Sequence, residues 1–201
     1  MTPQDITKQT YIDNFETYKE KTPNIVSGEF IIWMDDFINH LSQGATILEL
    51  GSAEGRDARY LRDHGLKVTC TDIIPQALTS LSEDGFTTSL YDFRDEPHTE
   101  WADAFDGILA KAVYHHASQE IFKRSLTSLS KVLCSGGIFC LTFKVGIGEE
   151  IETEKLGQER FFKYYTLSEL KKILDNHNEY KFINSQTALD GKWIQILMKK
   201  L

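Results

Sequence analysis

With 201 residues, of which 41% are hydrophobic and 26% charged, the chain predicts one globular domain, residues 1–201, with a substantial core. It contains neither a stretch of roughly 20 apolar residues nor a secretory leader pattern, which predicts a cytoplasmic protein with no membrane partner. Its net charge of −8 argues against a protein that follows a phosphate backbone, so we expect a small-molecule partner and no nucleic acid.

Residues 1–44 precede the first predicted strand and have the spacing of two amphipathic helices. Tyr11 and Tyr18 share one helical face within residues 4–20, and a similar apolar period runs through residues 29–42. We expect each aromatic residue of the first stripe to pack on the sheet, because such stripes usually belong to the core.

Residues 46–57, Thr-Ile-Leu-Glu-Leu-Gly-Ser-Ala-Glu-Gly-Arg-Asp, contain a strand, a glycine loop and the start of a helix. Gly51 and Gly55 let the backbone approach a ligand closely, and the helix N-terminus offers free N–H groups. Asp72 ends a second apolar strand 21 residues after Gly51. A carboxylate at that offset can accept hydrogen bonds from both hydroxyls of a ribose, so the pattern predicts a cofactor with a nucleoside part.

The loop positions separate two classes of cofactor. A dinucleotide enzyme needs glycines at the first, third and sixth positions, which here hold Gly51, Ala53 and Arg56. Arg56 would block the close helix–strand packing of that motif, which argues against a dinucleotide oxidoreductase. The segment instead resembles motif I of the class I S-adenosylmethionine-dependent methyltransferases, E/D-x-G-x-G-x-G, through Glu49, Gly51, Ala53 and Gly55. Ala53 replaces the middle glycine, where a methyl group fits if the backbone angle φ is negative.

The resemblance continues in family order. Asp72 resembles the ribose-binding acid of motif II, and Asp92-Phe93 resembles motif III, whose acid accepts from the adenine amino group. Residues 105–110 resemble the fourth strand, and residues 133–139 resemble the turn into the fifth. The resemblance implies S-adenosylmethionine as cofactor and S-adenosylhomocysteine as product. It implies that the cofactor contacts Glu49, Gly51, Ser52, Ala53, Gly55, Arg56, Asp72, Ile73, Asp92, Phe93 and Lys111.

Short apolar strands alternate with amphipathic helices between residues 46 and 145, which predicts a parallel α/β sheet covered on both faces. The family resemblance implies a Rossmann-like sheet of seven strands in the order 3-2-1-4-5-7-6, with the last strand antiparallel. It also implies that residues 1–44 form a helical cap or lid over the cofactor.

Several local signals predict element ends. Gly136-Gly137 is expected to end a helix near residues 118–133, and residues 146–163 are expected to form a polar loop. Thr166, three residues before Glu169, fits a capping box at the start of a further helix. Residues 181–187 and 193–198 are expected to form two last strands, and the family resemblance implies that they close the sheet as an antiparallel hairpin.

His115 and His116 follow the fourth strand, at the sheet edge where open α/β sheets bind ligands. Histidine titrates near neutral pH, so we predict His115 as the base that takes the acceptor's proton, with a helix-entry role as an equally supported alternative. Lys111 either contacts the cofactor through its backbone or points to solvent. Methyl transfer depends on alignment of two reactants, and no His/Cys group has ligand spacing, so we predict no metal.

Phe143-Lys144-Val145-Gly146 and Arg160–Tyr165 resemble segments of a subgroup of small bacterial methyltransferases, F-K-x-G and an R-x-F-x-x-Y-like stretch. The resemblance implies that Lys144, Arg160 and Tyr164 contact the methyl acceptor, with cations that favour an anionic group. We expect His116 to contact the acceptor as well, because it follows the fourth strand. Alternatively, Arg160 pairs with an acid of the same loop, for which the candidates are Glu149, Glu150 and Glu154.

The combined features predict an S-adenosylmethionine-dependent methyltransferase that acts on a small-molecule acceptor as a monomer or homodimer. Two alternatives keep the same fold. An RNA methyltransferase would show a steep salt dependence of RNA binding, and a non-catalytic S-adenosylmethionine-binding module would bind the cofactor without turnover.

Overall fold

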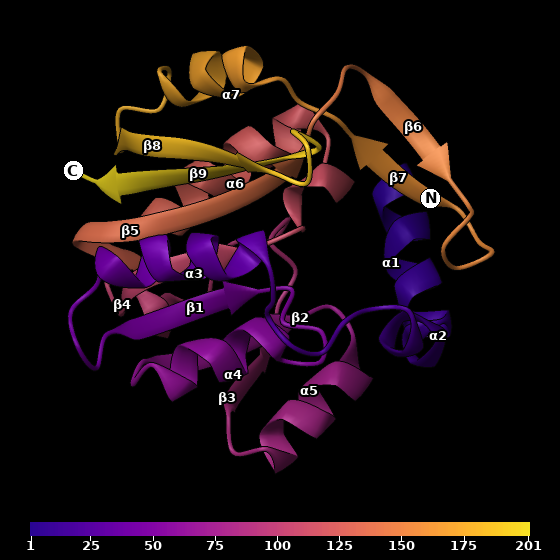
Figure 1. Cartoon of the computed structure of the whole chain (residues 1–201), viewed down its shortest axis with the longest axis horizontal. Helices are drawn as coiled ribbons and strands as arrows, with labels where there is room; N and C mark the ends of the chain where they lie inside the picture. The colour runs from indigo at the N-terminus through magenta and orange to yellow at the C-terminus, as the bar shows by residue number, and fades with distance from the viewer.

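A seven-stranded sheet in the order β3-β2-β1-β4-β5-β9-β8 forms the centre of the computed structural model, which describes residues 1–201 (Figure 1). Strands β1 to β5 pair in parallel, and β9 runs antiparallel to both β5 and β8. The strands are β1 (Thr46–Leu50), β2 (Lys67–Asp72), β3 (Thr87–Leu90), β4 (Phe105–Ala110), β5 (Leu133–Lys144), β8 (Tyr180–Ala188) and β9 (Trp193–Lys200). The predicted strand order is confirmed, and two short strands outside the sheet account for the different numbering.

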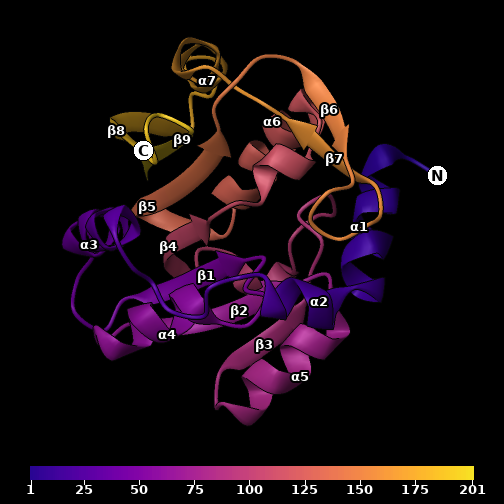
Figure 2. The same cartoon turned by 45° about the vertical axis from the view of Figure 1, so that its right-hand side comes forward.

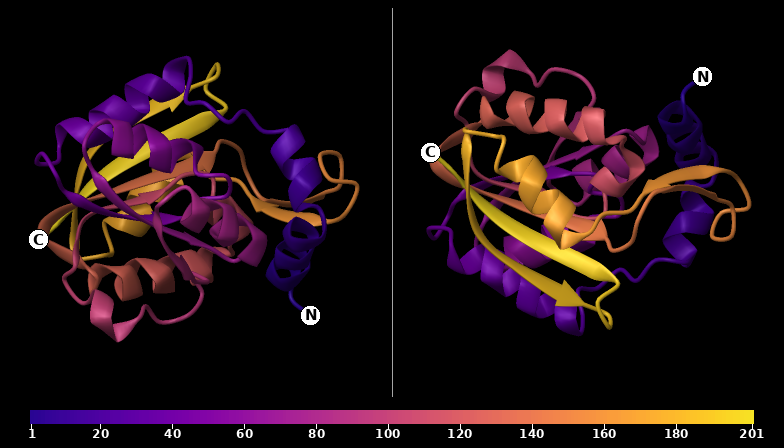
Figure 3. Two further views of the ribbon diagram at one scale, coloured as in Figure 1. Left: turned by 90° about the horizontal axis from the view of Figure 1, so that it is seen from below. Right: turned by 90° about the horizontal axis from the view of Figure 1, so that it is seen from above.

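Helices cover both faces of this sheet (Figure 3). Helices α3 (Glu29–Asn39), α4 (Arg56–Asp63) and α5 (Pro75–Glu83) contribute apolar side chains to one core, and α6 (Gln119–Ser130) and α7 (Leu167–Leu174) contribute to the other. Strand β1 supplies both cores, because successive side chains of a strand point to opposite faces. Ile47 packs in the α3–α4 core and Leu48 in the α6 core, and both are fully buried.

Local sequence signals set several helix starts as predicted. Pro75 occupies the first turn of α5, where no N–H is needed. Thr166 and Glu169 form the predicted capping box at the start of α7. Helix α6 begins after Ser118, whose side chain accepts from the backbone N–H of Ile121. Two short 3-10 helices, η1 (Thr99–Trp101) and η2 (Tyr114–His116), flank β4.

Two predicted boundaries are wrong. Gly136-Gly137 does not end a helix, because α6 ends at Ser130 and both glycines lie within β5. The pairing of β5 with β4 shifts register there, and Gly136 has a φ of 79° that suits glycine in a bulge. Residues 146–163 are not a loop, because they contain an antiparallel hairpin of β6 (Glu149–Glu152) and β7 (Arg160–Lys163).

The N-terminal segment forms two helices instead of the one predicted over residues 4–20. Helix α1 (Pro3–Asp13) is capped by Thr2 and Asp5, and α2 (Phe15–Glu20) follows after a break at Asn14. Helix α1 lies beside β7, at the end of the sheet where the parallel strands finish (Figure 2). None of the helices has the length and apolar character that crossing a bilayer requires.

Candidate functional site

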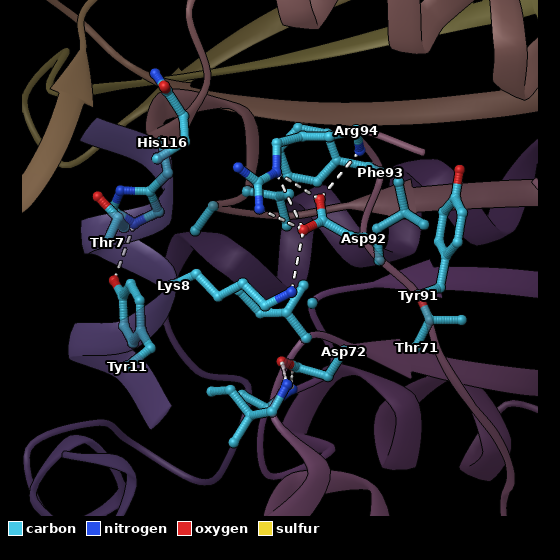
Figure 4. A pocket seen from close by; sticks show the side chains of 18 residues that line it. Thr7, Lys8, Tyr11, Thr71, Asp72, Tyr91, Asp92, Phe93, Arg94 and His116 are labelled. Carbon is cyan, nitrogen blue, oxygen red and sulfur yellow. Dashed lines mark hydrogen bonds and ion pairs between the residues drawn. The ribbon is translucent and has the colours of Figure 1, made fainter. Parts of the chain in front are cut away.

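A pocket of about 800 Å³, including its open mouth, lies between the carboxyl ends of the parallel strands and helix α1 (Figure 4). Its sheet side includes Gly51, Asp72 and Asp92, and its helix side includes Lys8 and Tyr11. The carboxyl edge of a parallel sheet is the usual ligand site of open α/β folds, since loops and helix N-termini converge there. Motifs that are far apart in the sequence therefore share one pocket.

The loop after β1 requires backbone conformations and space that glycine supplies. Gly51 has a φ of 68°, and a Cβ atom there would lie 2.8 Å from the Val113 side chain. Gly55 has a φ of 77° and leaves no room for a Cβ atom beside Leu81. Ala53 has a φ of 47°, so the negative angle expected at this position is wrong, and the loop holds an alanine in a conformation that favours glycine.

Asp72 organises the same loop from the end of β2. Its carboxylate accepts from the backbone N–H of Ala53 at 2.8 Å and from that of Ile74 at 3.0 Å. Burial raises the pKa of Asp72 to about 6, and the backbone N–H groups oppose this. An ionised carboxylate offers roughly four lone-pair sites, so two remain for ligand hydroxyls. The geometry therefore leaves two acceptor positions for a ribose diol, and the assignment of Asp72 to the ribose stays a prediction.

Asp92 lies on the same wall and is tied to α1. It accepts from Arg94 through Nη2 at 2.7 Å and from Lys8 Nζ at 3.5 Å, and Arg94 also binds Asp5 of α1 at 2.7 Å. Burial would raise the pKa of Asp92, but the hydrogen bonds from Arg94 lower it below its usual value. Phe93, the next residue, lines the pocket beside it. If an adenine amino group donated to Asp92, it would share this acceptor with Lys8.

A cluster of buried charges lies below the glycine loop. Asp57 binds Lys111 Nζ and Arg56 Nη2, both at 2.9 Å, so the Lys111 side chain does not point to solvent. Glu49 is 3% exposed and its Oε2 has no hydrogen-bond partner. Burial and the charge of Asp57 raise the pKa of Glu49 to about 8. A smaller hollow beside this cluster is lined by Ser52, Arg56 and Lys111, and it continues from Gly51 and Ala53.

The two histidines of η2 take different positions. His116 lines the pocket, whereas His115 lies behind it, 4% exposed and stacked on Phe162. His116 Nδ1 lies 2.7 Å from the Phe161 carbonyl oxygen, and its Nε2 lies 2.9 Å from the Tyr11 hydroxyl. Burial lowers the pKa of His116 to about 3 and that of His115 well below its usual value. Both rings are therefore neutral at neutral pH.

The structure does not bring the remaining predicted acceptor residues, Lys144, Arg160 and Tyr164, to the pocket lining. Arg160 is 3% exposed, pairs with Glu152 and donates to the Tyr11 hydroxyl at 3.0 Å. It thus pairs with an acid of this segment, but not with Glu149, Glu150 or Glu154. Lys144 Nζ lies 4.0 Å above the Phe162 ring, and the Tyr164 hydroxyl donates to Glu150 away from the pocket.

Four residues of α1 line the pocket although the sequence did not indicate them: Gln4, Thr7, Lys8 and Tyr11. Of these, Lys8 bonds to Asp92 and Tyr11 to His116. Tyr11 was visible in the sequence only as a member of an aromatic helical stripe, which by itself indicates core packing. No group of three or more His, Cys, Asp or Glu side chains in residues 1–201 is arranged to hold a metal ion.

Comparisons with known proteins agree with this geometry. Residues 48–141 match a family model described as a methyltransferase domain, and no curated protein matches the chain in sequence. One similar solved structure is the 1,6-didemethyltoxoflavin-N1-methyltransferase of Burkholderia thailandensis, which contains 1,6-didemethyltoxoflavin and S-adenosylhomocysteine. Its TM-score is 0.75 at 17% identity, and the alignment covers 100% of this chain and 91% of the Burkholderia chain. A methyltransferase of Methanosarcina mazei has a TM-score of 0.69 at 16% identity, over 82% of this chain and 96% of its own.

A third solved structure carries a different name. A Rhodobacter sphaeroides protein provisionally named a zinc-dependent alcohol dehydrogenase has a TM-score of 0.77 at 14% identity, over 96% of this chain and 98% of its own. Identities this low establish a common fold and leave chemistry to the family match and to the site.

Proposed function

We propose that this chain, whose residues 48–141 match the methyltransferase-domain model, is an S-adenosylmethionine-dependent methyltransferase of class I that methylates a small molecule held beneath α1. The roof over the pocket supports this choice of acceptor. Helix α1 and the β6–β7 hairpin both lie over the ends of the parallel strands (Figures 1 and 2). A polynucleotide or a folded protein would need a more open groove.

Direct hydrogen bonds hold the roof together. The Thr10 hydroxyl donates to the Glu159 carbonyl at 2.7 Å, and the Thr7 hydroxyl accepts from the Phe161 N–H at 2.8 Å. Both threonines are buried, at 2% and 3% exposed, so water does not compete for these bonds. The roof is therefore a packed part of the fold, which favours an acceptor small enough to enter beside it.

Charge at the pocket rim also favours a small acceptor over RNA. Lys8 and Arg94 are the cations of the pocket lining, and each is paired with Asp92, while Arg94 also binds Asp5. Cations that are already neutralised by carboxylates gain little from a phosphate backbone. An RNA acceptor is accordingly the second candidate.

We assign the nucleoside of the cofactor to the Asp72 and Asp92 side of the pocket, next to Phe93. The amino-acid end would lie toward the hollow lined by Ser52, Arg56 and Lys111, with Glu49 beneath it. When bound, the cofactor supplies a methyl group on a positively charged sulfur, and the chain then has to align an acceptor and remove its proton. The unused lone pairs of Asp72 fit the hydroxyls of such a ligand.

On the acceptor side we propose His116 as the base in place of the predicted His115. His116 lines the pocket and presents an imidazole nitrogen toward Tyr11, whereas His115 is screened by Phe162 and His116. The neutral imidazole has a lone pair that can take a proton, and general-base catalysis typically contributes roughly 10²–10⁴-fold. Burial makes this ring a weak base in the free protein, so the base role requires that the bound reactants raise its pKa. His115 would then pack behind the base.

The test uses methyl-labelled S-adenosylmethionine with a panel of small phenols, thiols, amines and carboxylic acids, and with total RNA in parallel. Label in a small molecule supports the proposal, and label only in RNA replaces it with the second candidate. Cofactor binding without label in either identifies a non-catalytic binding module. His116→Asn should lose turnover and keep cofactor affinity, while the matched variant His115→Asn should keep more of the turnover.

A further inference from the structure

We propose that Tyr11 relays the acceptor's proton to His116, so that helix α1 supplies a catalytic residue as well as a roof. The proposal rests on the small-molecule methyl transfer proposed above. Tyr11 belongs to none of the motifs that identify the family and lies 105 positions from His116 in the chain. The relay involves four atoms, which are the two ring nitrogens of His116, the Tyr11 hydroxyl oxygen and Nη1 of Arg160.

The protonation pattern of the His116 ring follows from its partners. Its Nδ1 lies 2.7 Å from the Phe161 carbonyl oxygen, which can only accept, so Nδ1 carries the proton of the neutral ring. The other nitrogen, Nε2, therefore has a lone pair and no proton. Within hydrogen-bond distance of Nε2 lie the Tyr11 hydroxyl at 2.9 Å and His115 Nε2 at 3.1 Å.

The direction of the Tyr11 hydrogen bonds follows in the same way. A guanidinium can only donate, so Arg160 Nη1 donates to the Tyr11 oxygen at 3.0 Å. Tyr11 in turn donates its own proton to His116 Nε2. The bonds thus run in one direction, from Arg160 through Tyr11 to His116 and on to the Phe161 carbonyl.

This arrangement excludes a direct approach of an acceptor to the base. The single lone pair of His116 Nε2 already faces the Tyr11 hydroxyl and His115, while the Tyr11 oxygen keeps a second lone pair, and the Tyr11 side chain is one of those that line the pocket (Figure 4). A proton from the pocket can therefore reach His116 through the Tyr11 oxygen. Arg160 beside that oxygen opposes the rise in the pKa of Tyr11 that burial causes.

The step is balanced in atoms and charge. An acceptor X–H gives its proton to the Tyr11 oxygen while the Tyr11 proton moves to His116 Nε2. The electron pair left on X forms the bond to the methyl carbon, and the carbon–sulfur bond breaks with its electrons remaining on sulfur. The products are X–CH₃, S-adenosylhomocysteine and a His116 imidazolium, so the positive charge passes from sulfur to the ring.

Tyr11→Phe tests the relay because it removes the hydroxyl and keeps the ring that packs on Tyr18 at 5.4 Å. Tyr60→Phe is the matched control, since its hydroxyl donates to Asp35 at 2.6 Å outside the pocket. Nitrogen-15 NMR of the histidine rings in the whole protein should show His116 protonated at Nδ1, with an Nε2 resonance that moves in Tyr11→Phe only. A His116 ring protonated at Nε2, or an unmoved resonance, overturns the relay whatever the acceptor is.

Turnover supplies the second readout, with three named probes. Phenol and 2-mercaptoethanol lose a proton on methylation, and transfer to them should fall by roughly 10²-fold or more in Tyr11→Phe at unchanged cofactor affinity. Dimethyl sulfide has no proton to lose, so its methylation should survive the substitution. Equal losses for both kinds of probe would reduce Tyr11 to a structural role. Failure of the proposed function looks different, because the parent protein itself would then label no small molecule.

Discussion

Asp72→Asn should weaken cofactor binding and the glycine loop together, because one carboxylate serves both. In the free protein the two carboxylate oxygens accept from the N–H groups of Ala53 and Ile74, at 2.8 and 3.0 Å. An asparagine amide has one oxygen and one NH₂ group, so one of these backbone donors meets another donor. The side chain is 4% exposed, so water cannot replace the lost acceptor.

The magnitude follows from two separate losses. An unsatisfied buried donor costs about 1–3 kcal/mol, which should appear as a lower free energy of unfolding without ligand. Loss of the charged acceptor for the ribose hydroxyls costs roughly 1.5–3 kcal/mol of binding, equivalent to about 10–150-fold in Kd. Burial raises the pKa of Asp72 to about 6, and binding needs the carboxylate, so parental affinity should be full well above pH 6 and fall as the pH is lowered through it. The variant should lack this pH dependence.

Calorimetric titration with S-adenosylhomocysteine at several pH values measures both effects, and thermal unfolding without ligand shows that the variant is folded. Asp84→Asn is the matched control, because it removes an acid that pairs with Arg59 outside the pocket. A folded Asp72→Asn protein with parental affinity at every pH would refute the assignment of Asp72 to the ribose.

Three further changes follow from the site. Burial and Asp57 raise the pKa of Glu49 from 4.5 to about 8, so between these pH values the folded protein holds a proton that the unfolded chain releases. The free energy of unfolding should therefore fall as pH rises from 4.5 to about 8, and urea unfolding of Glu49→Gln should lack this contribution to the pH dependence. Ala53→Gly relieves a φ of 47° and should raise the free energy of unfolding by up to about 1 kcal/mol; an unchanged Tm would contradict it. Lys8→Ala removes one of the two cations that pair with Asp92 and should tighten S-adenosylhomocysteine binding, measured by calorimetry, by up to about fivefold, since partly exposed pairs contribute at most about 1 kcal/mol. Weaker binding would show that Lys8 assists the ligand.

The sheet and its cofactor edge were predictable because their signals are local. Gly51, Asp72 and Asp92 follow apolar strands at family spacing, and parallel strands bring such carboxyl ends to one edge. The identity of the residue that faces the acceptor was not predictable in this way. His115 and His116 are adjacent in sequence, and the carbonyl of Phe161 and the hydroxyl of Tyr11 distinguish them only in three dimensions.

The β6–β7 hairpin was missed for a related reason. Its strands are only four residues each, and three of the four residues of β6 are glutamates, which are depleted in strands. Pairing is supported by the bonds from Thr7 and Thr10 of α1 to the backbone around β7. No window of sequence around the hairpin contains those two partners.

The roof also fixes an order of events during synthesis. Helix α1 has 11 residues, a length at which an isolated helix is marginal in water, so it needs β7 as a packing partner. The hydrogen bonds that join them span 149 and 154 positions in the chain. At a ribosomal rate of about 5–20 residues per second, β7 is synthesised roughly seven to thirty seconds after the first helix. During that interval strands β1 to β4 have already left the synthesis site while the pocket has no cover, so a nascent chain passes through a stage in which its ligand edge is open to solvent.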